Sequence, residues 1–364
     1  MTEATADIPS PGPSARGGVT LKDVAQASGV SISTASRALA NNPRVSKETR
    51  RHVQSVAREL NYVVNGLAQS MIGTGRRTVA FVTDAFLAEP FARIARGVDE
   101  VMCRHDALLL LNATHHAPER RQALIELFAQ QRTSGVILVG TQNDTTAHRG
   151  DIARYHAILQ GVGARLVLCG ASAIPELDDI PTVAYDQCGG TRNATITLLN
   201  AGHRRIAFLG YAQRTTAMER FAGYQQAMRS AGIPVDLSNP LVITVGNVSS
   251  QIMPAIRRIL DQDASRRPTA MVCITDHAAL CVYRVAQQLG LHLPQDLSIT
   301  GFDDLSSNDV LAPALSSVAV PFEAVGRYAA RLVLGLPVEH GDHPVFPVRF
   351  TARGSIAAPY PQAD

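Results

Sequence analysis

Apolar residues follow two different patterns along the chain, and the change occurs near Arg77. Before Arg77 they recur at helical spacing, whereas after it short continuous apolar runs alternate with stretches of helical spacing. Eight of these runs predict strands, at residues 78–84, 107–114, 135–140, 165–170, 205–210, 241–246, 270–275 and 297–304. Helices are predicted between them, for example at Pro90–Arg104, Glu119–Gln131, Met218–Ala231 and Asp276–Leu289.

Strands that are apolar throughout and are separated by helices indicate parallel sheets covered on both faces. Residues 78–364 are many for one such sheet, so we expect an α/β core of two lobes. Ligands of open α/β sheets bind beyond the carboxyl ends of the strands. The pattern therefore predicts a ligand cleft between the lobes.

The region before Arg77 predicts three short helices between Thr20 and Leu60. A hydroxyl residue stands where each helix begins and can cap its free amides. These residues are Thr20, which can form a capping box with Asp23, Ser31 and Ser46. Gly29 supplies a tight turn before the second helix, and Asn42-Pro43 separates the second helix from the third.

The second of these helices lies in the segment SGVSISTASRAL, Ser28 to Leu39, which has Ser, Thr or Arg at six of its twelve positions. Helical spacing places its apolar residues, Val30, Ala35, Ala38 and Leu39, on one flank. Most of the remaining side chains, which include short hydroxyls and Arg37, then face outward. Such a surface suits a groove lined with base edges and phosphates. The alternative is a serine-rich amphipathic surface helix.

The charge of the chain is unevenly distributed. Residues 19–77 contain nine Lys and Arg against three Asp and Glu, a balance of +6. Residues 1–18 carry −1, and residues 78–364 carry −2. A small basic head on a slightly acidic body fits nucleic-acid binding by one module.

Cysteine content and hydropathy predict a cytoplasmic protein. The five cysteines, which form no CxxC pair, lie in or near apolar runs and are expected to be buried thiols. No apolar stretch is long enough to span a membrane. Residues 1–18 lack the apolar core of a signal peptide, and their Pro, Gly and Ser content predicts a disordered tail.

Residues 19–71, VTLKDVAQASGVSISTASRALANNPRVSKETRRHVQSVARELNYVVNGLAQSM, resemble the DNA-binding head and hinge of the LacI/GalR family of bacterial transcription regulators almost end to end. The body resembles that family through shorter segments. These are GHRRIAFLG (202–210), ERFAGYQQAM (219–228), GFDD (301–304), LAPALSSVAVPFEAVGRYAARLVL (311–334) and RGSIAAP (353–359).

The resemblance implies a helix-turn-helix domain at 19–64 and a hinge helix with its linker at 65–76. It further implies a core like a periplasmic binding protein at 77–358, followed by a tail at 359–364. The chain would cross between the lobes near Tyr185, Ser317 and Pro347. The first lobe would then comprise about 77–185 and 318–346, and the second about 186–317 and 347–358.

The resemblance also implies which residues meet DNA. Ile32, Ser33 and Thr34 would read bases, with Ile32 limited to apolar contact such as a thymine methyl. Ser36 and Arg37 match positions that contact phosphates and bases. Backbone-contacting positions are matched by Thr20, Ser31, Ser46, Thr49, Tyr62 and Asn65.

In the hinge, Ala68 and Met71 would touch or wedge the central base step in the minor groove. The family usually has leucine where Met71 stands, and methionine is an acceptable apolar wedge. Gly66 departs from the family and weakens an isolated hinge helix by up to ~1 kcal/mol. The alternative to a hinge is an ordinary linker.

Effector-binding positions of the family are matched by Arg214, Thr216, Arg220 and Asp303, and by Phe91, which would stack on the ligand. An ion pair of Arg220 and Asp303 with a purely structural role, and core packing of Phe91, are the alternatives. Val248 and Thr275 are also expected to bind the effector, although they depart from the family. Thr275 replaces the usual Asn, and Val248 replaces a residue that is often aromatic. Cys169 is a third departure, at a position that is often acidic. The expected effector is a small neutral sugar or sugar derivative, with a nucleobase or nucleoside as the alternative.

The sequence predicts neither an enzyme nor a metal or cofactor site. His115-His116, His203 and His277 lack the spacing of metal ligands, Asp303-Asp304 has no accompanying nucleophile, and GVGAR (161–165) is too short for a dinucleotide motif. A solute-binding protein would need a signal peptide and no basic head. We therefore expect a repressor controlled by an effector, which binds a pseudo-palindromic operator as a homodimer through helices of the first lobe, including Pro90–Arg104. Whether the effector releases or promotes DNA binding stays open.

Overall fold

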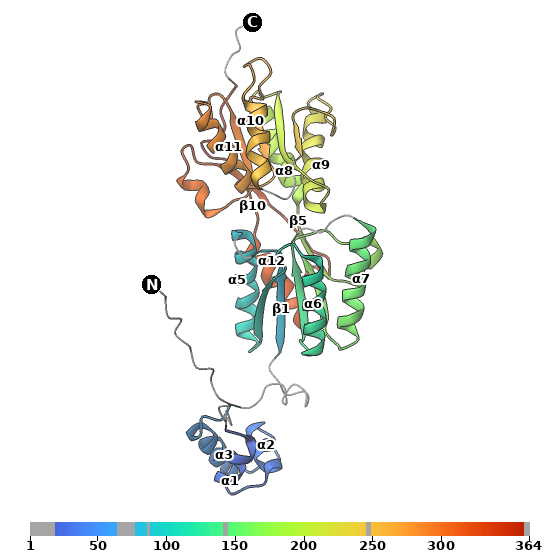
Figure 1. The fold of residues 1–364 in the computed structure, drawn as a ribbon, viewed down its shortest axis with the longest axis vertical. Coiled ribbons are helices and arrows are strands. Elements are labelled where there is room, and N and C mark those ends of the chain that lie inside the picture. Colours follow the sequence, from blue (N-terminus) through green and yellow to red (C-terminus); the bar gives the residue numbers. More distant parts are fainter. Residues whose placement is uncertain (1–18, 64–76, 86–87, 141–144, 245–248, 360–364) are drawn as a thin grey trace, which may run out of the picture. The chain divides into compact units, whose positions relative to one another are not determined.

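The computed structural model describes residues 19–63, 77–85, 88–140, 145–244 and 249–359, apart from the side chains of residues 249–251. The chain divides into two compact units, residues 1–76 and residues 77–364. In Figure 1 the described part of the first unit is blue, and the second unit runs from cyan to red.

The described part of the first unit contains the helices α1 (Leu21–Ala27), α2 (Ile32–Leu39) and α3 (Lys47–Glu59). All three were predicted, and they are confirmed together with their caps. Thr20 and Asp23 form the capping box, while the side chains of Ser31 and Ser46 accept hydrogen bonds from backbone amides of α2 and α3. The three helices bury a small common core around Val24, Ala35 and Val53.

The second unit contains two six-stranded sheets. In the first, the strand order is β11-β5-β4-β3-β1-β2, and all neighbours are parallel. Its strands are β1 (Thr78–Thr83), β2 (Leu108–Ala113), β3 (Gly135–Val139), β4 (Arg165–Cys169), β5 (Thr182–Tyr185) and β11 (Val345–Phe346).

In the second sheet the order is β12-β10-β9-β8-β6-β7, parallel except for the edge strand β12. Its strands are β6 (Ile206–Tyr211), β7 (Val242–Thr244), β8 (Ala270–Cys273), β9 (Ser298–Asp303), β10 (Ser316–Ala319) and β12 (Arg349–Thr351). The predicted α/β class and the eight predicted strands are confirmed. The pattern does not predict β5, β10, β11 and β12, which are two to four residues long.

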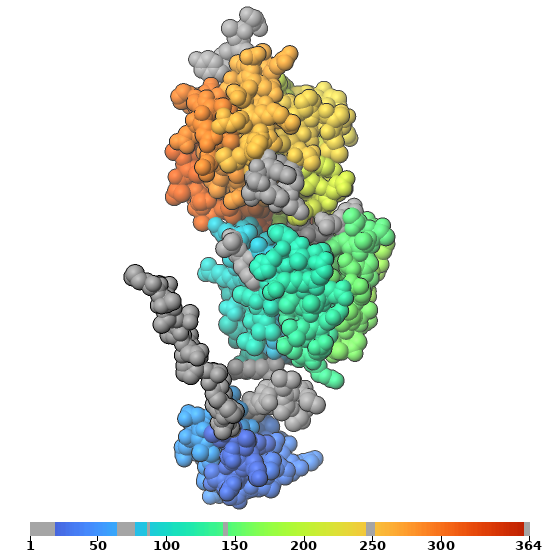
Figure 2. Space-filling view, viewed as in Figure 1, coloured from blue at the N-terminus to red at the C-terminus, as the bar shows by residue number. Residues whose placement is uncertain are grey.

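Helices cover both faces of each sheet. On the first sheet, α5 (Glu89–Arg104) and α12 (Phe322–Leu334) share one apolar cluster, and α6 (Pro118–Gln130) and α7 (Thr146–Gln160) share another. On the second sheet, the corresponding pairs are α10 (Ser249–Leu260) with α11 (Asp276–Gln288) and α8 (Gln187–Asn200) with α9 (Thr215–Ser230). Two short 3-10 helices, η1 (Pro175–Leu177) and η2 (Ser306–Val310), follow β4 and β9. Figure 2 shows the two lobes as separate bodies of packed atoms that meet at a waist.

Helix α9 begins at Thr215, and the predicted start at Met218 is therefore too late. The extended backbone of Arg214 ends the preceding loop and takes the N-cap position. Arg220 consequently lies in the second turn of α9 and does not begin it. Since Thr216 and Arg220 are four residues apart, they lie on the same face of the helix.

The chain passes between the lobes three times. It leaves the first sheet after β5, returns after β10 into α12, and crosses again between β11 and β12. The second crossing, expected near Ser317, follows Ala319, because β10 completes its pairing with β9 before it leaves the sheet. The apolar cluster around α5 and α12 also includes Phe302 of the second lobe, so the lobes share packed side chains at the crossings.

Two glycines bring α5 and α12 into close contact. A Cβ atom on Gly97 would lie 2.1 Å from the backbone oxygen of Glu323, and one on Gly326 would lie 2.1 Å from that of Ile94. Only glycine allows backbones to approach so closely. Helix α5, which carries Phe91, is therefore held firmly against the helix that follows the second crossing.

The cysteines differ in exposure. Cys169 and Cys273 are buried, and Cys188 and Cys281 are partly exposed. Cys103 is exposed, so the expectation that every thiol is buried is wrong there. The apolar residues around Cys103 belong to α5, which buries only one side, and Cys103 lies on the other. In the described residues, no helix combines the length and the apolar character needed to cross a membrane.

Candidate functional site

The outer face of α2 carries the side chains that the sequence singles out for base contact. Ile32 is 51% exposed, Ser33 and Arg37 are exposed, and Thr34 is partly exposed. On the opposite side of the helix, Ala35 and Ala38 are buried in the core of the first unit. The first unit thus presents an apolar side chain, short hydroxyls and a guanidinium together, which is chemistry suited to a DNA groove.

Hydroxyl groups surround the beginnings of α2 and α3. The Oγ of Ser31 accepts from the amide of Thr34 at 3.1 Å and lies 2.8 Å from that residue's hydroxyl. Ser46 and Thr49 repeat this arrangement at α3, with distances of 3.1 and 2.8 Å. A hydroxyl that accepts from an amide keeps its proton for a phosphate oxygen, and helix N-termini attract anions. Tyr62 is half-buried beside the same core, whereas Asn65, Ala68 and Met71 lie outside the described residues.

Arg50 has a structural role that the sequence pattern does not reveal. Its Nη2 donates to the backbone oxygens of Asn42 and Val45, at 2.8 and 3.0 Å. The guanidinium therefore fixes the loop between α2 and α3. Other basic residues of the unit are exposed on its surface, namely Lys22, Arg37, Arg44, Lys47, Arg51 and Arg58.

A pocket of about 300 Å³ lies between the two lobes of the second unit. Six residues that the sequence proposes for effector binding line it together. They are Phe91, Arg214, Thr216, Arg220, Thr275 and Asp303. Val248 lies outside the described residues, and Cys169 is fully buried while its neighbour Gly170 lines the pocket.

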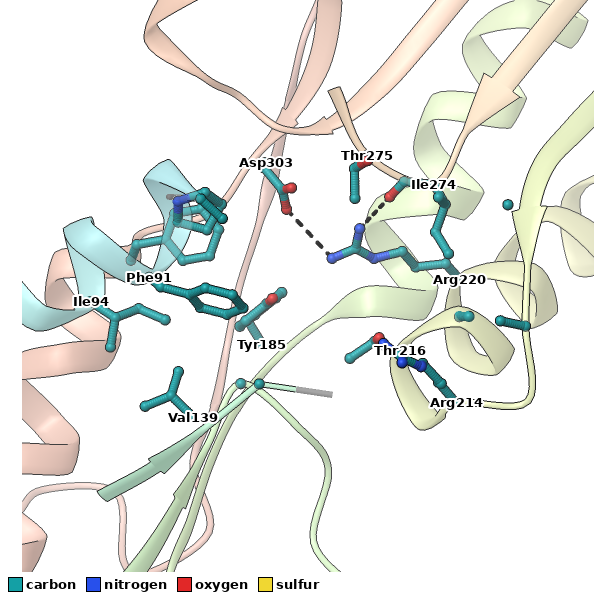
Figure 3. A pocket seen from close by; sticks show the side chains of 18 residues that line it. Phe91, Ile94, Val139, Tyr185, Arg214, Thr216, Arg220, Ile274, Thr275 and Asp303 are labelled. Atoms are coloured by element: carbon teal, nitrogen blue, oxygen red, sulfur yellow. Dashed lines mark hydrogen bonds and ion pairs between the residues drawn. The ribbon is translucent and has the colours of Figure 1, made fainter. Parts of the chain in front are cut away.

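The buried guanidinium of Arg220 forms the centre of one wall of the pocket (Figure 3). Its Nε donates to Oε1 of Gln187 at 2.6 Å, and its Nη1 donates to the backbone oxygen of Ile274. Its Nη2 lies 3.5 Å from Oδ1 of Asp303, and its Cζ lies 3.6 Å from the ring centre of Phe302. The guanidinium is thus fixed on several sides. Sequence reasoning misses Gln187, because nothing local links it to a residue 33 positions away.

Asp303 is buried at the end of β9, where its backbone adopts a φ of +109°. Burial raises the pKa of Asp303 to about 7, against the opposing effect of Arg220. The negative charge of Asp276 raises that pKa further. At neutral pH this carboxyl group is therefore close to its midpoint of ionisation, which makes it sensitive to a ligand that donates a hydrogen bond.

Asp276, at the start of α11, supports this wall from behind. Its carboxylate accepts from the hydroxyl of Ser317, the amide of Leu305 and the side-chain amide of Asn308, at 2.5, 2.8 and 2.8 Å. Burial raises the pKa of Asp276 to about 6. The neighbouring Thr275 caps α11 through the amide of Ala278 at 3.2 Å, so its hydroxyl oxygen serves the fold as well as the pocket.

The opposite wall of the pocket is aromatic. Phe91, Tyr185 and Phe322 all line it, and Figure 3 shows Phe91 and Tyr185 across the pocket from Arg214, Thr216 and Arg220. Burial raises the pKa of Tyr185 to about 12, so its hydroxyl stays protonated at neutral pH. A pocket with one aromatic wall and one polar wall suits a ligand with a flat apolar face and a polar edge.

The histidines show no metal-binding arrangement in the part of the chain that the structure describes, where no group of three or more His, Cys, Asp or Glu could hold a metal ion. His203 is buried and hydrogen-bonds to Thr269, Ser298 and the backbone oxygen of Ala357 at 2.8 to 3.0 Å. Its role is to join the last described residues to the second sheet.

Comparison with known proteins gives matches for both units. Residues 20–65 match the family described as bacterial regulatory proteins, lacI family, and residues 196–356 match a periplasmic binding protein-like domain. The HTH-type transcriptional repressor CytR of Escherichia coli K12 is 30% identical over 86% of this chain and 89% of its own length. The ribose operon repressor of Haemophilus influenzae is 29% identical over 86% of this chain and 91% of its own length.

Solved structures agree with these matches. A transcriptional regulator CelR–cellobiose complex is 28% identical with a TM-score of 0.65, over 93% of this chain and 99% of that one. The lac repressor dimer bound to operator and the anti-inducer ONPF has a TM-score of 0.77 over the same shares. At 24% identity the second structure shows a shared fold.

The raised pKa of Asp303 predicts how its replacement changes stability with pH. Because the folded chain holds this proton more tightly than an unfolded aspartate of pKa about 3.9, its contribution to stability falls as pH rises from about 4 to about 7. The side chain in Asp303→Asn cannot ionise, so this variant shows no such loss of stability in that pH range. We expect its free energy of unfolding, relative to that of the wild type, to rise between pH 5 and pH 8 by about 1 kcal/mol or more.

Urea denaturation of the full chain at both pH values measures this difference. Asp261→Asn, which replaces an exposed aspartate, is the control and should show no change between the two pH values. If the free energies of unfolding of the wild type and Asp303→Asn differ by the same amount at pH 5 and at pH 8, the raised pKa of Asp303 is contradicted.

Proposed function

Since the chain belongs to the LacI family of bacterial regulatory proteins, whose members are DNA-binding transcriptional regulators and not enzymes, we propose that it is a repressor controlled by a hydroxyl-rich small molecule. The observation that carries the proposal is the pocket between the lobes, with a fixed Arg220–Asp303 pair facing an aromatic wall. A repressor acts where its operator lies, so we place the protein in the cytoplasm.

The first unit would bind operator DNA with the outer face of α2 in the major groove. Ile32, Ser33 and Thr34 would contact base edges, and Ser36 and Arg37 would contact bases and phosphates. The remaining backbone contacts would come from Thr20, Ser31, Ser46, Thr49, Tyr62 and Asn65. Phosphate contacts fix the register of the protein on the duplex, and base contacts give the specificity. Ala68 and Met71 would act at the central base step.

A homodimer would place two such heads on a pseudo-palindromic site, which doubles the few base contacts that one head offers. The proposed interface lies on the first lobe and includes α5. Support comes from the neighbouring edge strand β2, where Leu108 and Leu111 are 53% and 52% exposed. Exposed apolar side chains at a sheet edge are often covered by a partner.

We expect sedimentation to show a dimer at micromolar concentration with and without DNA, because the proposed interface lies on the core and not on the heads. A monomer in both conditions would refute this arrangement.

The proposed effector is a sugar or a sugar derivative. Vicinal hydroxyls can donate to Asp303 and approach the polar wall, while the C–H face of a sugar ring packs on Phe91 and Tyr185. The complex of a 28% identical regulator with cellobiose adds support from a relative. The second candidate is a nucleobase or nucleoside, because Phe91 lines the pocket and its ring can stack on a flat base.

Effector binding would bias the lobes toward one arrangement and so change the operator affinity of the heads. A coupling of ~1–3 kcal/mol corresponds to a 5- to 150-fold change in that affinity. Either direction of coupling is compatible with this mechanism.

Met71→Ala is expected to lower the affinity for operator DNA much more than the affinity for random DNA. The wedge acts only where the central step is kinked, whereas non-specific binding comes mostly from counterion release. Arg37→Ala should weaken both kinds of binding, because it also removes a positive charge near phosphates. Fluorescence anisotropy with an operator selected from a random pool measures both affinities, and equal losses for Met71→Ala would contradict the hinge assignment.

Titration calorimetry with sugars, sugar acids and nucleobases tests the effector pocket. A hydroxyl-rich ligand should bind the wild type and lose roughly tenfold or more in affinity to Asp303→Ala, because a charge-assisted hydrogen bond is removed. Asp303→Asn keeps the shape of the side chain and separates the loss of charge from the loss of volume. Asp261→Asn is the matched control. A ligand that binds wild type and both Asp303 variants equally well would show that this pocket is not its site.

A further inference from the structure

Two glutamates join the lobes on either side of the pocket. Glu89 of α5, in the first lobe, accepts hydrogen bonds from Ser306 at the start of η2, in the second lobe. The amide of Ser306 lies 3.2 Å from each carboxylate oxygen, and its hydroxyl lies 2.9 Å from Oε2. Glu219 of α9, in the second lobe, accepts from the hydroxyl of Ser172, in the first lobe, at 2.5 Å.

Both glutamates directly precede residues that line the pocket. Glu89 is followed by Pro90 and Phe91, and Glu219 by Arg220. Phe91 and Arg220 lie on opposite sides of the pocket in Figure 3. Moving the lobes apart therefore has to break one contact beside the aromatic wall and one beside the polar wall.

We propose that the Glu89–Ser306 and Glu219–Ser172 contacts are interlobe ties that hold the cleft at the width seen here, which makes both glutamates positioning residues for the effector. The crossings supply the pivot about which the lobes move, and the ties supply the resistance to opening. The role of the ties in regulation rests on the proposed effector site. The two contacts themselves do not depend on it.

The two ties differ in strength because they differ in exposure. Glu89 is partly exposed and Ser306 is exposed, so water competes for their hydrogen bonds. Glu219 and Ser172 are partly buried, and burial raises the pKa of Glu219 although the Ser172 hydroxyl opposes that rise. A hydrogen bond to a partly buried carboxylate is the stronger of the two. Loss of the Glu219 tie should therefore open the cleft more than loss of the Glu89 tie.

Amide hydrogen exchange of the full chain, without ligand or DNA, tests the ties across the cleft. The amide of Ser306 donates to Glu89, so its exchange rate reports whether that tie is closed. Ser172→Ala and Glu219→Ala leave Glu89 and Ser306 intact. If the ties act together, both variants should raise the exchange rate of the Ser306 amide by roughly three- to tenfold, as expected when the net contribution of one hydrogen bond is lost.

Ser172→Thr keeps a hydroxyl and should retain the wild-type rate. Glu176→Ala removes a carboxylate that pairs with Arg149 within the first lobe, and it should leave the Ser306 amide unchanged. A local effect of either substitution would not reach Ser306, and a loss of overall stability would raise exchange throughout the core. Wild-type exchange of the Ser306 amide in both Ser172→Ala and Glu219→Ala would overturn the proposal, whatever ligand the pocket binds.

Discussion

A guanidinium that is buried in a protein cannot lose its proton, so every donor that it carries needs an acceptor or an aromatic face. Arg220 is 5% exposed and meets this need with groups from three separate parts of the second lobe. Gln187 comes from α8, the backbone oxygen of Ile274 follows β8, and Asp303 ends β9. The ring of Phe302 covers one face of the group. Removal of any of these partners leaves a buried charge less well satisfied, and so the arrangement of the second lobe around the pocket depends on this one side chain.

The first unit is the part that the sequence predicts best, because its determinants are local. Thr20 with Asp23, Ser31 with Thr34 and Ser46 with Thr49 are pairs three residues apart, and each marks a helix start in the structure. The strands of the core are predicted for a related reason, since a buried parallel strand is apolar throughout. The pattern fails where the determinant is distant. The short strands at the crossings form by pairing with a strand of the same sheet that is distant in sequence. The Arg220–Gln187 contact likewise joins residues that no local spacing connects.

The pocket shows the same limit. The resemblance to the family brings together six residues that do line one cavity, but it assigns no role at the pocket to Tyr185, Phe322 or the two glutamates beside the cavity. These side chains come from a crossing strand, from a helix that follows a crossing, and from the contact between lobes. Their roles depend on how the lobes face one another, which is a property of the tertiary structure. Thr275 illustrates the opposite case, since its replacement of asparagine is visible in the sequence while its function as the cap of α11 is not.

The division of the two walls between the lobes explains how a small molecule can control the cleft. The polar wall satisfies its charges within the second lobe, because the acceptors of Arg220 and the donors to Asp276 all belong to that lobe. The aromatic wall belongs to α5, β5 and α12 and contributes apolar surface. Separation of the lobes therefore leaves no buried charge unpaired, and its cost is confined to the ties and to the packing at the crossings. A cost of that limited size is one that the contacts of a ligand with both walls can outweigh, so that the ligand determines which arrangement of the lobes is populated.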